Sequence, residues 1–291
     1  MVQYSGEACS RVRGLVTFRC LMGPGALINI RFMRLSPRKF APGSALRVAL
    51  RQLLRQVLRA IGKFPQDPAG QAHFVRTRVK RLQSLSRLVP RGQVWQETFL
   101  EPCRALKDLF AETRDVTIVQ GFAGKYALGE AHHLRASLPP DLVEARRLAE
   151  GALDLLADDP YWVKVEWKEI AHRAVDTYRA ARVAWKEAKR RNAPDEVFHA
   201  WRRRVKRLLY QCEYLGGRAG LRRFIRRVDR LGEVLGDMQD MCLAEMWLKK
   251  QKSLGVPPDL SRSKESMRRA ALRLAPVLLG SRPKVFRQML G

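Results

Sequence analysis

Apolar residues recur at helical spacing along most of this 291-residue chain. From Ser44 onward, leucine and valine return every three or four positions, and proline or glycine separates the runs. No segment of useful length alternates as a β-strand does. We therefore expect helices over residues 44–61, 69–89, 94–122 (interrupted near Pro102), between 140 and 158, 161–191, 194–215, 221–252, 259–273 and 276–289. The pattern predicts an all-α fold.

A ten-residue segment occurs twice. Residues 73–82 read His-Phe-Val-Arg-Thr-Arg-Val-Lys-Arg-Leu, and residues 199–208 read His-Ala-Trp-Arg-Arg-Arg-Val-Lys-Arg-Leu. Seven of the ten positions are identical, at an offset of 126 residues (199 minus 73). The duplication predicts two related helical halves, about residues 44–157 and 158–291.

The helices that carry these segments, here called the signature helices, are predicted to be amphipathic. At about 100° per residue, one narrow arc of the first holds His73, Arg76, Lys80 and Arg87, and the opposite side holds Val75, Val79, Leu82, Leu85 and Val89. In the second, the polar arc holds His199, Arg202, Arg203, Lys206 and Tyr210, and the apolar arc holds Val197, Trp201, Val205, Leu208 and Leu215. Each half is thus expected to present a row of cations headed by a histidine.

A second duplicated element links residues 106–115 to residues 231–240, at an offset of 125 (231 minus 106). Both copies end in an aspartate, Asp115 and Asp240. We hypothesise that each aspartate pairs with an arginine of a signature helix, the candidates being Arg78 and Arg204, or Arg81 and Arg207. The alternative is an aspartate solvated on a helix surface.

Composition points to an anionic partner. The chain has 56 Lys and Arg against 28 Asp and Glu, a formal net charge of +28, which favours nucleic acid, polyphosphate or an anionic membrane surface as partners. Arginine predominates, and its guanidinium suits bidentate phosphate contacts. Five scattered cysteines without a CxxC motif suit a reducing, cytoplasmic compartment, with Cys212 and Cys242 expected as buried small apolar residues. No run of about 18 apolar residues occurs, which argues against a membrane-spanning helix.

Residues 1–43 differ from the rest of the chain. Three arginines precede a short apolar run that glycine and proline interrupt, and no small-residue cleavage site follows. We expect a disordered leader, or residues upstream of a true start at Met33, and assign it no function.

The duplicated elements resemble the CHAD family, the conserved-histidine α-helical domain, over about residues 45–290. The family's mark is a histidine with Arg at i+3, a basic pair at i+7 and i+8, and then Leu, given twice: here His73, Arg76, Lys80, Arg81 and Leu82, and His199, Arg202, Lys206, Arg207 and Leu208. Thr113-Arg114-Asp115 resembles its Ala-Arg-Asp element, and Leu235-Gly236-Asp237-Met238-Gln239-Asp240 its Leu-Gly-x-x-x-Asp element. The chain departs from the family at i+10 (Gln83, Leu209) and at i+4 (Thr77, Arg203), which affects individual contacts rather than the fold.

The resemblance implies two pseudo-symmetric four-helix bundles with a basic central groove or pore that binds inorganic polyphosphate. The residues expected to bind it are His73, Arg76, Lys80, Arg81, Arg87, His199, Arg202, Arg203, Lys206 and Arg207. A basic cluster of Arg222, Arg223, Arg226, Arg227 and Arg230 extends this surface or serves solubility. Such a module would be non-catalytic and cytoplasmic, and targeting to polyphosphate granules follows as an extension. The alternative is a helical nucleic-acid-binding protein, although neither polar arc carries the Asn or Gln that reads bases, apart from Gln83.

Little in the sequence indicates catalysis or a cofactor. CHAD-like domains often accompany a triphosphatase tunnel domain, but its Glu-x-Glu-x-Lys motif is absent here. His132, His133 and His172 lack zinc-site spacing, and Asp158-Asp159 lies at a helix boundary. No nucleophile elbow or P-loop occurs. We therefore expect a binding protein without a metal.

Overall fold

The computed structural model of the protein describes residues 41–90, 92–125, 139–157, 161–216, 219–250 and 256–290. The chain divides into two units, residues 1–31 and 32–291, and all described residues belong to the second. The expected leader therefore lies outside the described residues except for positions 41–43. Cys9, Cys20, His132, His133 and Asp158-Asp159 also lie outside them.

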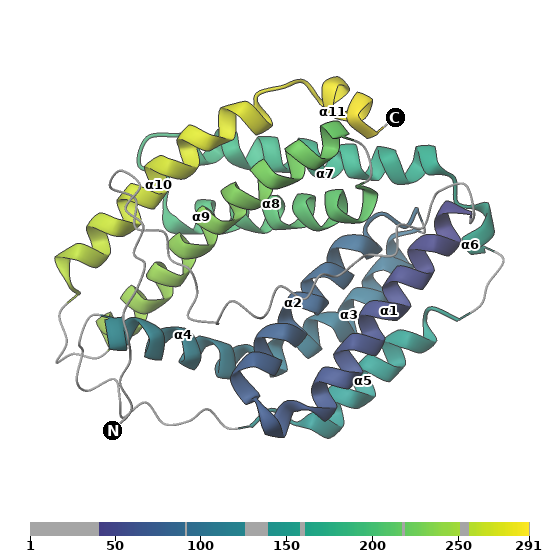
Figure 1. Ribbon diagram of the computed structural model, residues 1–291, viewed down its shortest axis with the longest axis horizontal. Coiled ribbons are helices and arrows are strands. Elements are labelled where there is room, and N and C mark those ends of the chain that lie inside the picture. The colour runs from purple at the N-terminus through teal and green to yellow at the C-terminus, as the bar shows by residue number, and fades with distance from the viewer. Residues whose placement is uncertain are drawn as a thin grey trace. The chain divides into compact units, whose positions relative to one another are not determined.

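The described residues are helical, with no strand among them, which confirms the all-α prediction (Figure 1). In chain order the helices are α1 (Pro42–Gly62), the 3₁₀ turn η1 (Phe64–Gln66), α2 (Pro68–Ser86), α3 (Gln93–Leu109), α4 (Ala111–Lys125), α5 (Leu142–Asp154), α6 (Tyr161–Lys164), α7 (Trp167–Ala188), α8 (Asp195–Leu215), α9 (Ala219–Lys250), α10 (Pro258–Leu279) and α11 (Pro283–Leu290). The signature helices are α2 and α8.

The helices pack in two groups of four. In the first, α1 contacts α2 and α5, and α3 contacts the same two. In the second, α8 contacts α7 and α9, and α10 contacts the same two. These groups lie in different parts of Figure 1 and meet where α2 packs on α8. The pseudo-twofold relation between them stays a prediction.

The predicted apolar faces form most of the core on α2 and α8. On α8 the prediction was wrong for Tyr210, which was expected on the polar arc and is buried, and Val197 and Leu215 of the apolar arc are only half-buried. On α2, Val75, Val79 and Leu82 have no exposed surface, and on α8 Trp201 and Leu208 have none either. Burying side chains of this size contributes roughly 1.5–3 kcal/mol each, so the apolar arcs fix which faces of α2 and α8 turn outward. Cys103, Cys212 and Cys242 are also buried as free thiols, as expected for the latter two.

Four expected boundaries were wrong. The helix expected from Ser44 begins at Pro42, because proline is favourable in the first turn, where its missing N–H costs nothing. The helix expected over residues 161–191 is divided, since Glu166 adopts an extended backbone and its N–H donates to the Glu169 carboxylate at 2.9 Å, starting α7 anew. In α10, Pro276 does not end the helix, which continues to Leu279.

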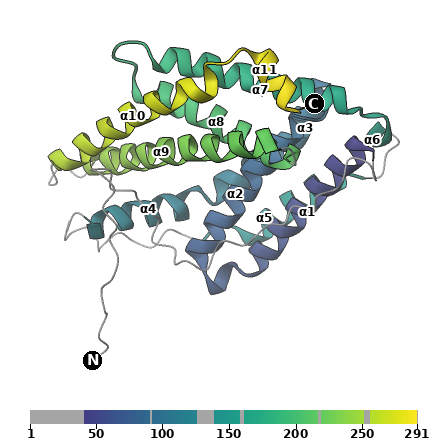
Figure 2. The same cartoon turned by 45° about the horizontal axis from the view of Figure 1, so that its top comes forward.

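The fourth difference has the largest consequence. Helix α3 continues through Pro102, and the break falls at Phe110 instead. After this break α4 leaves the direction of α3 and packs against α9 of the other group as well as against α2 (Figures 1 and 2). Helix α4 therefore carries residues of the first half to the second.

Candidate functional site

The two signature helices cross where the two groups meet. Near the crossing, the fully buried Gln211 of α8 donates from Nε2 to the Ser84 carbonyl of α2 at 2.8 Å. One turn away, Arg81 Nη1 and Glu213 Oε2 form an ion pair at 2.6 Å, and the Arg81 guanidinium lies over the Tyr210 ring. These contacts set the position of α2 relative to α8, and with it the spacing of their cations.

Five of the expected residues form one group, called here the central cluster: His73, Arg76 and Lys80 from α2, and His199 and Arg202 from α8. Burial first, and then the positive charges of Arg202 and Arg76, lower the pKa of Lys80 to about 7. Burial likewise lowers the pKa of His199 against its hydrogen bond to Gln239, and the charges of Arg203, Arg202 and Lys80 add to the lowering. The two predicted cation rows therefore converge, and each acts on the other electrostatically.

The histidines of this cluster are held mainly neutral at neutral pH. The pKa of His73 is lowered by burial first and then by the charge of Lys80, although its side chain stays open to solvent. The lowered pKa and the solvent exposure together fit a His73 side chain that lines a hollow and faces its solvent. His199 donates from Nδ1 to Gln239 Oε1, which leaves Nε2 as an acceptor in the neutral form.

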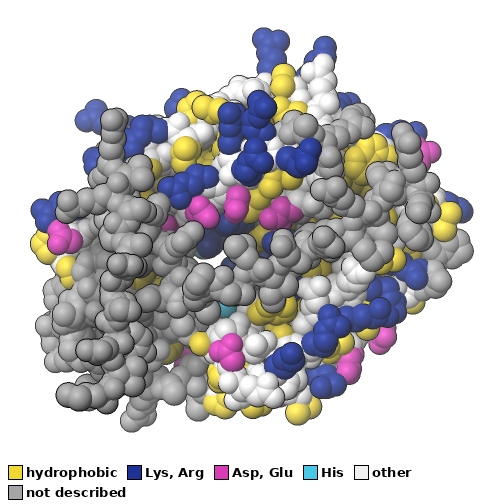
Figure 3. Space-filling view, viewed as in Figure 1, with side chains coloured by type: hydrophobic (Ala, Val, Ile, Leu, Met, Phe, Trp, Pro, Cys, Tyr) yellow, Lys and Arg dark blue, Asp and Glu magenta, His cyan; other side chains and the backbone are white. Residues whose placement is uncertain are grey.

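Figure 3 shows that this face of the molecule is hollowed near its middle. Lys or Arg side chains and a row of Asp or Glu side chains lie along its upper side, and a histidine is visible below it. The hollow and the convergent pKa effects indicate a recessed, cationic surface.

Arg114 of α4 joins the central cluster, although it was not among the binding residues expected from the sequence. It forms ion pairs with Asp115 at 2.9 Å and with Asp240 of α9 at 2.6 Å. Its charge also lowers the pKa of His73 and, more weakly than Arg202, that of Lys80. The available signal was the second duplicated element, in which Arg114 takes the place that Gln239 takes next to His199.

The expected partners of the two repeated aspartates were therefore wrong. Both carboxylates pair with Arg114 rather than with an arginine of a signature helix. They still act on signature arginines at longer range, because Asp240 raises the pKa of Arg202 and Asp115 raises that of Arg76, in each case against the larger effect of burial. The carboxylates thus hold the cluster together without neutralising α2 and α8 directly.

Three other expected residues gather at a different place, called here the flanking cluster: Arg87, Arg203 and Arg207, joined by Arg204. Burial first, and then the charges of Arg87, Arg204 and Arg203, lower the pKa of Arg207 to about 9. Arg87 also has one acidic neighbour, Glu97, which raises its pKa while burial lowers it. The ten expected cations thus do not form a single row.

The last two expected residues already have acidic partners. Arg81 pairs with Glu213 as described, and Lys206 Nζ lies 3.5 Å from Asp229 Oδ1. By contrast, Lys80, the repeat equivalent of Lys206, forms no ion pair with any described residue. At this repeated position the cation of α2 therefore lacks the acidic partner that its equivalent on α8 has.

Fold and site together define an all-helical protein in which two repeated helices bring histidine, arginine and lysine side chains to one recessed surface. The model of the CHAD domain family matches residues 93–249, which is more than half of the chain, from α3 to α9. The chain belongs to the CHAD domain family, a family associated with polyphosphate binding. The second signature segment lies inside the matched region, and the first lies before it.

Among solved structures, the crystal structure of the CHAD domain from the plant Ricinus communis is similar, with a TM-score of 0.48 and 16% sequence identity. The alignment covers 86% of this chain and 92% of that one. No curated protein matches the sequence. In the part of the chain that the structure describes, no helix has the length and apolar character needed to cross a membrane.

Proposed function

We propose that the protein binds inorganic polyphosphate at the central cluster and does so without catalysis. The observation that carries the proposal is the convergence of His73, Arg76 and Lys80 with His199 and Arg202 across the α2–α8 crossing. Burial and nearby positive charges lower the pKa values of these groups, so their charged forms are unfavourable in the free protein. A bound polyanion would stabilise the charged forms and raise these pKa values.

The chemistry of the cluster suits a repeating phosphate chain. Such a chain carries about one negative charge per phosphate and has no base edges, so it needs donors at regular spacing rather than a shaped pocket. On a helix, positions i, i+3 and i+7 advance by about 4.5 Å and then by about 6 Å along one face. Arg76 and Arg202 can grip two oxygens each, whereas Lys80 offers a point charge.

The flanking cluster would extend this surface. Arg87, Arg203 and Arg207 lie near the same helix crossing, so a long chain held at the centre could continue to them. We assign no catalytic residue. Retention by its ligand would place a cytoplasmic protein of this kind at polyphosphate granules.

A competition experiment tests the proposal. Labelled long-chain polyphosphate is bound to the protein and challenged with unlabelled polyphosphate, duplex DNA, single-stranded RNA and short phosphates at physiological salt. Polyphosphate should displace the label at far lower phosphate concentration than either nucleic acid. Equal displacement by DNA or RNA would mean that binding reflects only net charge, and would favour the nucleic-acid-binding alternative.

Matched variants locate the site. The triple variant Arg76→Ala, Lys80→Ala, Arg202→Ala should weaken polyphosphate binding by about 100-fold or more, at roughly 1–1.5 kcal/mol per lost charged contact. The control triple variant Arg59→Ala, Arg222→Ala, Arg226→Ala removes the same charge from exposed positions and should have little effect. The salt dependence of log K should fall by about two units only in the first variant. Equal losses of affinity in the two triple variants would mean that polyphosphate binds outside the central cluster or binds through net charge alone.

A further inference from the structure

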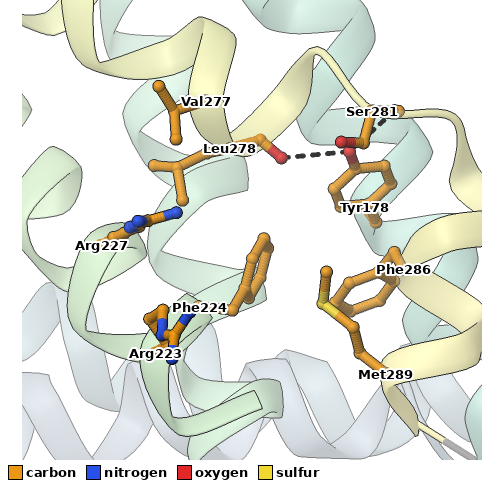
Figure 4. A pocket seen from close by; sticks show the side chains of 9 residues that line it. All are labelled: Tyr178, Arg223, Phe224, Arg227, Val277, Leu278, Ser281, Phe286 and Met289. Carbon is orange, nitrogen blue, oxygen red and sulfur yellow. Dashed lines mark hydrogen bonds between the residues drawn. The ribbon is translucent and has the colours of Figure 1, made fainter. Parts of the chain in front are cut away.

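A cavity of about 220 Å³ lies in the second helix group, away from both cation clusters (Figure 4). Its walls come from α7, α9, α10 and α11, and none of its residues belongs to α2, α4 or α8. Apolar side chains of Phe224, Phe286 and Met289 form much of the lining, and two arginines of α9, Arg223 and Arg227, stand on one side. The combination of apolar wall and paired cation distinguishes it from the central cluster.

The apolar wall is preformed by an aromatic group. Tyr178 and Phe286 stack with their ring centroids 4.7 Å apart at 8°, and Phe224 packs against Phe286 at 5.2 Å. The Tyr178 hydroxyl donates to the carbonyls of Leu278 and Ser281, which fixes the ring (Figure 4). These contacts also hold α11 against α7, so the cavity does not depend on a ligand for its shape.

The two arginines have no acidic partner among the described residues. Arg223 and Arg227 are exposed, and neither forms a hydrogen bond or an ion pair there. They are four positions apart, which places them on one helix face with a rise of about 6 Å. Two guanidinium groups at that separation can hold one anionic head group between them.

We propose that this cavity binds a small organic anion, consisting of a flat apolar or aromatic body and one phosphate or carboxylate head. The body would lie against Phe224, Phe286 and Met289, and the head would meet Arg223 and Arg227. Bare phosphate would leave the apolar wall in contact with water, and a neutral aromatic molecule would leave the arginines unpaired. The volume limits the body to about the size of one aromatic ring.

The site would give a role to part of the basic cluster on α9, which lies outside the proposed polyphosphate site. Of the five arginines in the cluster on α9, Arg230 pairs with Glu233 at 3.2 Å. Arg222 and Arg226 are exposed but do not line the cavity. Only Arg223 and Arg227 stand beside the apolar wall, and this division supplies a matched control.

Phenyl phosphate and benzoate are the probes, and they distinguish the two head groups. Binding is followed by the methyl resonance of Met289 in methionine-labelled protein, assigned with Met289→Leu. At least one of the two probes should shift this resonance and bind about tenfold or more tightly than inorganic phosphate or benzyl alcohol, which each lack one half of the ligand. Arg223→Gln with Arg227→Gln should weaken that binding by about tenfold or more, whereas Arg222→Gln with Arg226→Gln should change it by less than about threefold.

Several results would overturn the proposal. Inorganic phosphate that binds as well as phenyl phosphate would show that the apolar wall contributes nothing. Equal losses in the two double variants would reduce the effect to general charge, and a Met289 resonance that neither probe moves would mean that the cavity stays empty. The triple variant Arg76→Ala, Lys80→Ala, Arg202→Ala should keep full phenyl phosphate or benzoate binding. This separates the outcome from that of the polyphosphate proposal.

Discussion

Lys80 makes the proposed polyphosphate binding depend on pH in a defined way. Its pKa of about 7 means that its amine is about half protonated in the free protein at neutral pH. A bound polyanion would raise this pKa, because it adds negative charge to that of Asp240, which does not offset burial and the nearby cations. Binding above neutral pH should therefore take up a proton at Lys80.

The size of the pH dependence of polyphosphate affinity follows from the pKa of Lys80. Below the free pKa the amine is already charged, so binding needs no proton there. Above it, each pH unit weakens binding by about tenfold, or about 1.4 kcal/mol, until the pH reaches the pKa of the complex. Between about pH 6 and about pH 8 the affinity should fall by about tenfold through Lys80 alone. The two histidines, with pKa values lowered below 6.5, add a further gain in affinity only at more acidic pH.

The assay is polyphosphate affinity against pH at constant ionic strength, together with calorimetry in two buffers of different ionisation enthalpy. Wild-type protein should take up about 0.9 proton on binding at about pH 8. Lys80→Met should bind more weakly at acidic pH and lose the slope above neutral pH. Lys80→Arg should keep the affinity and also lose the slope. The end groups of polyphosphate also titrate, but their contribution is the same for wild type, Lys80→Met and Lys80→Arg and cancels when the three pH profiles are compared. An unchanged slope in Lys80→Met would refute the reasoning.

Three further predictions concern stability, measured by urea unfolding. Gly43→Ala should destabilise the protein by about 1–3 kcal/mol, because its Cβ would lie 2.3 Å from the backbone oxygen of Trp162, whereas Gly62→Ala meets open space and should be neutral or stabilising by up to about 1 kcal/mol. Arg114→Met should cost about 2 kcal/mol by leaving its two carboxylates unpaired, and a cost within error would contradict the bridging role of α4. Because folding lowers the pKa of Lys80 from 10.5 to about 7, the unfolded chain binds more protons in that window, and wild-type stability should rise with pH across it. Lys80→Met should flatten that rise, and an identical pH profile in the variant would count against it.

The helices and their faces could be read from the sequence because they depend on local periodicity. The apolar arc of α2 and most of that of α8 lie in the core, and five residues of the polar arcs come together in the central cluster. Which cations stay available could not be read in this way. Arg81 and Lys206 match the signature as well as Lys80 does, but Glu213 and Asp229, distant in sequence or on another helix, lie beside them in space.

The break at Phe110 shows the same limit for the fold. Local signals favoured an interruption at Pro102, but the helix continues through that residue and ends at Leu109, seven positions later (109 minus 102). In the repeat, Phe110 corresponds to Leu235, which lies inside the unbroken α9. The break lets α4 pack on α9, a tertiary contact that local periodicity does not encode, and this packing brings Arg114 into the central cluster.

The ion pair between Arg81 and Glu213 at the helix crossing has no equivalent at the position related to it by the repeat. At an offset of 126, Arg81 corresponds to Arg207 and Glu213 corresponds to Arg87. One shoulder of the crossing therefore joins a cation to an acid, while its counterpart brings two arginines together. An exact duplication would make the two sides of the crossing equivalent, but the exchange of Glu213 for Arg87 leaves one side neutralised and the other positively charged. A symmetric polyanion that lay across both sides would therefore be attracted more strongly to the side of Arg87 and Arg207.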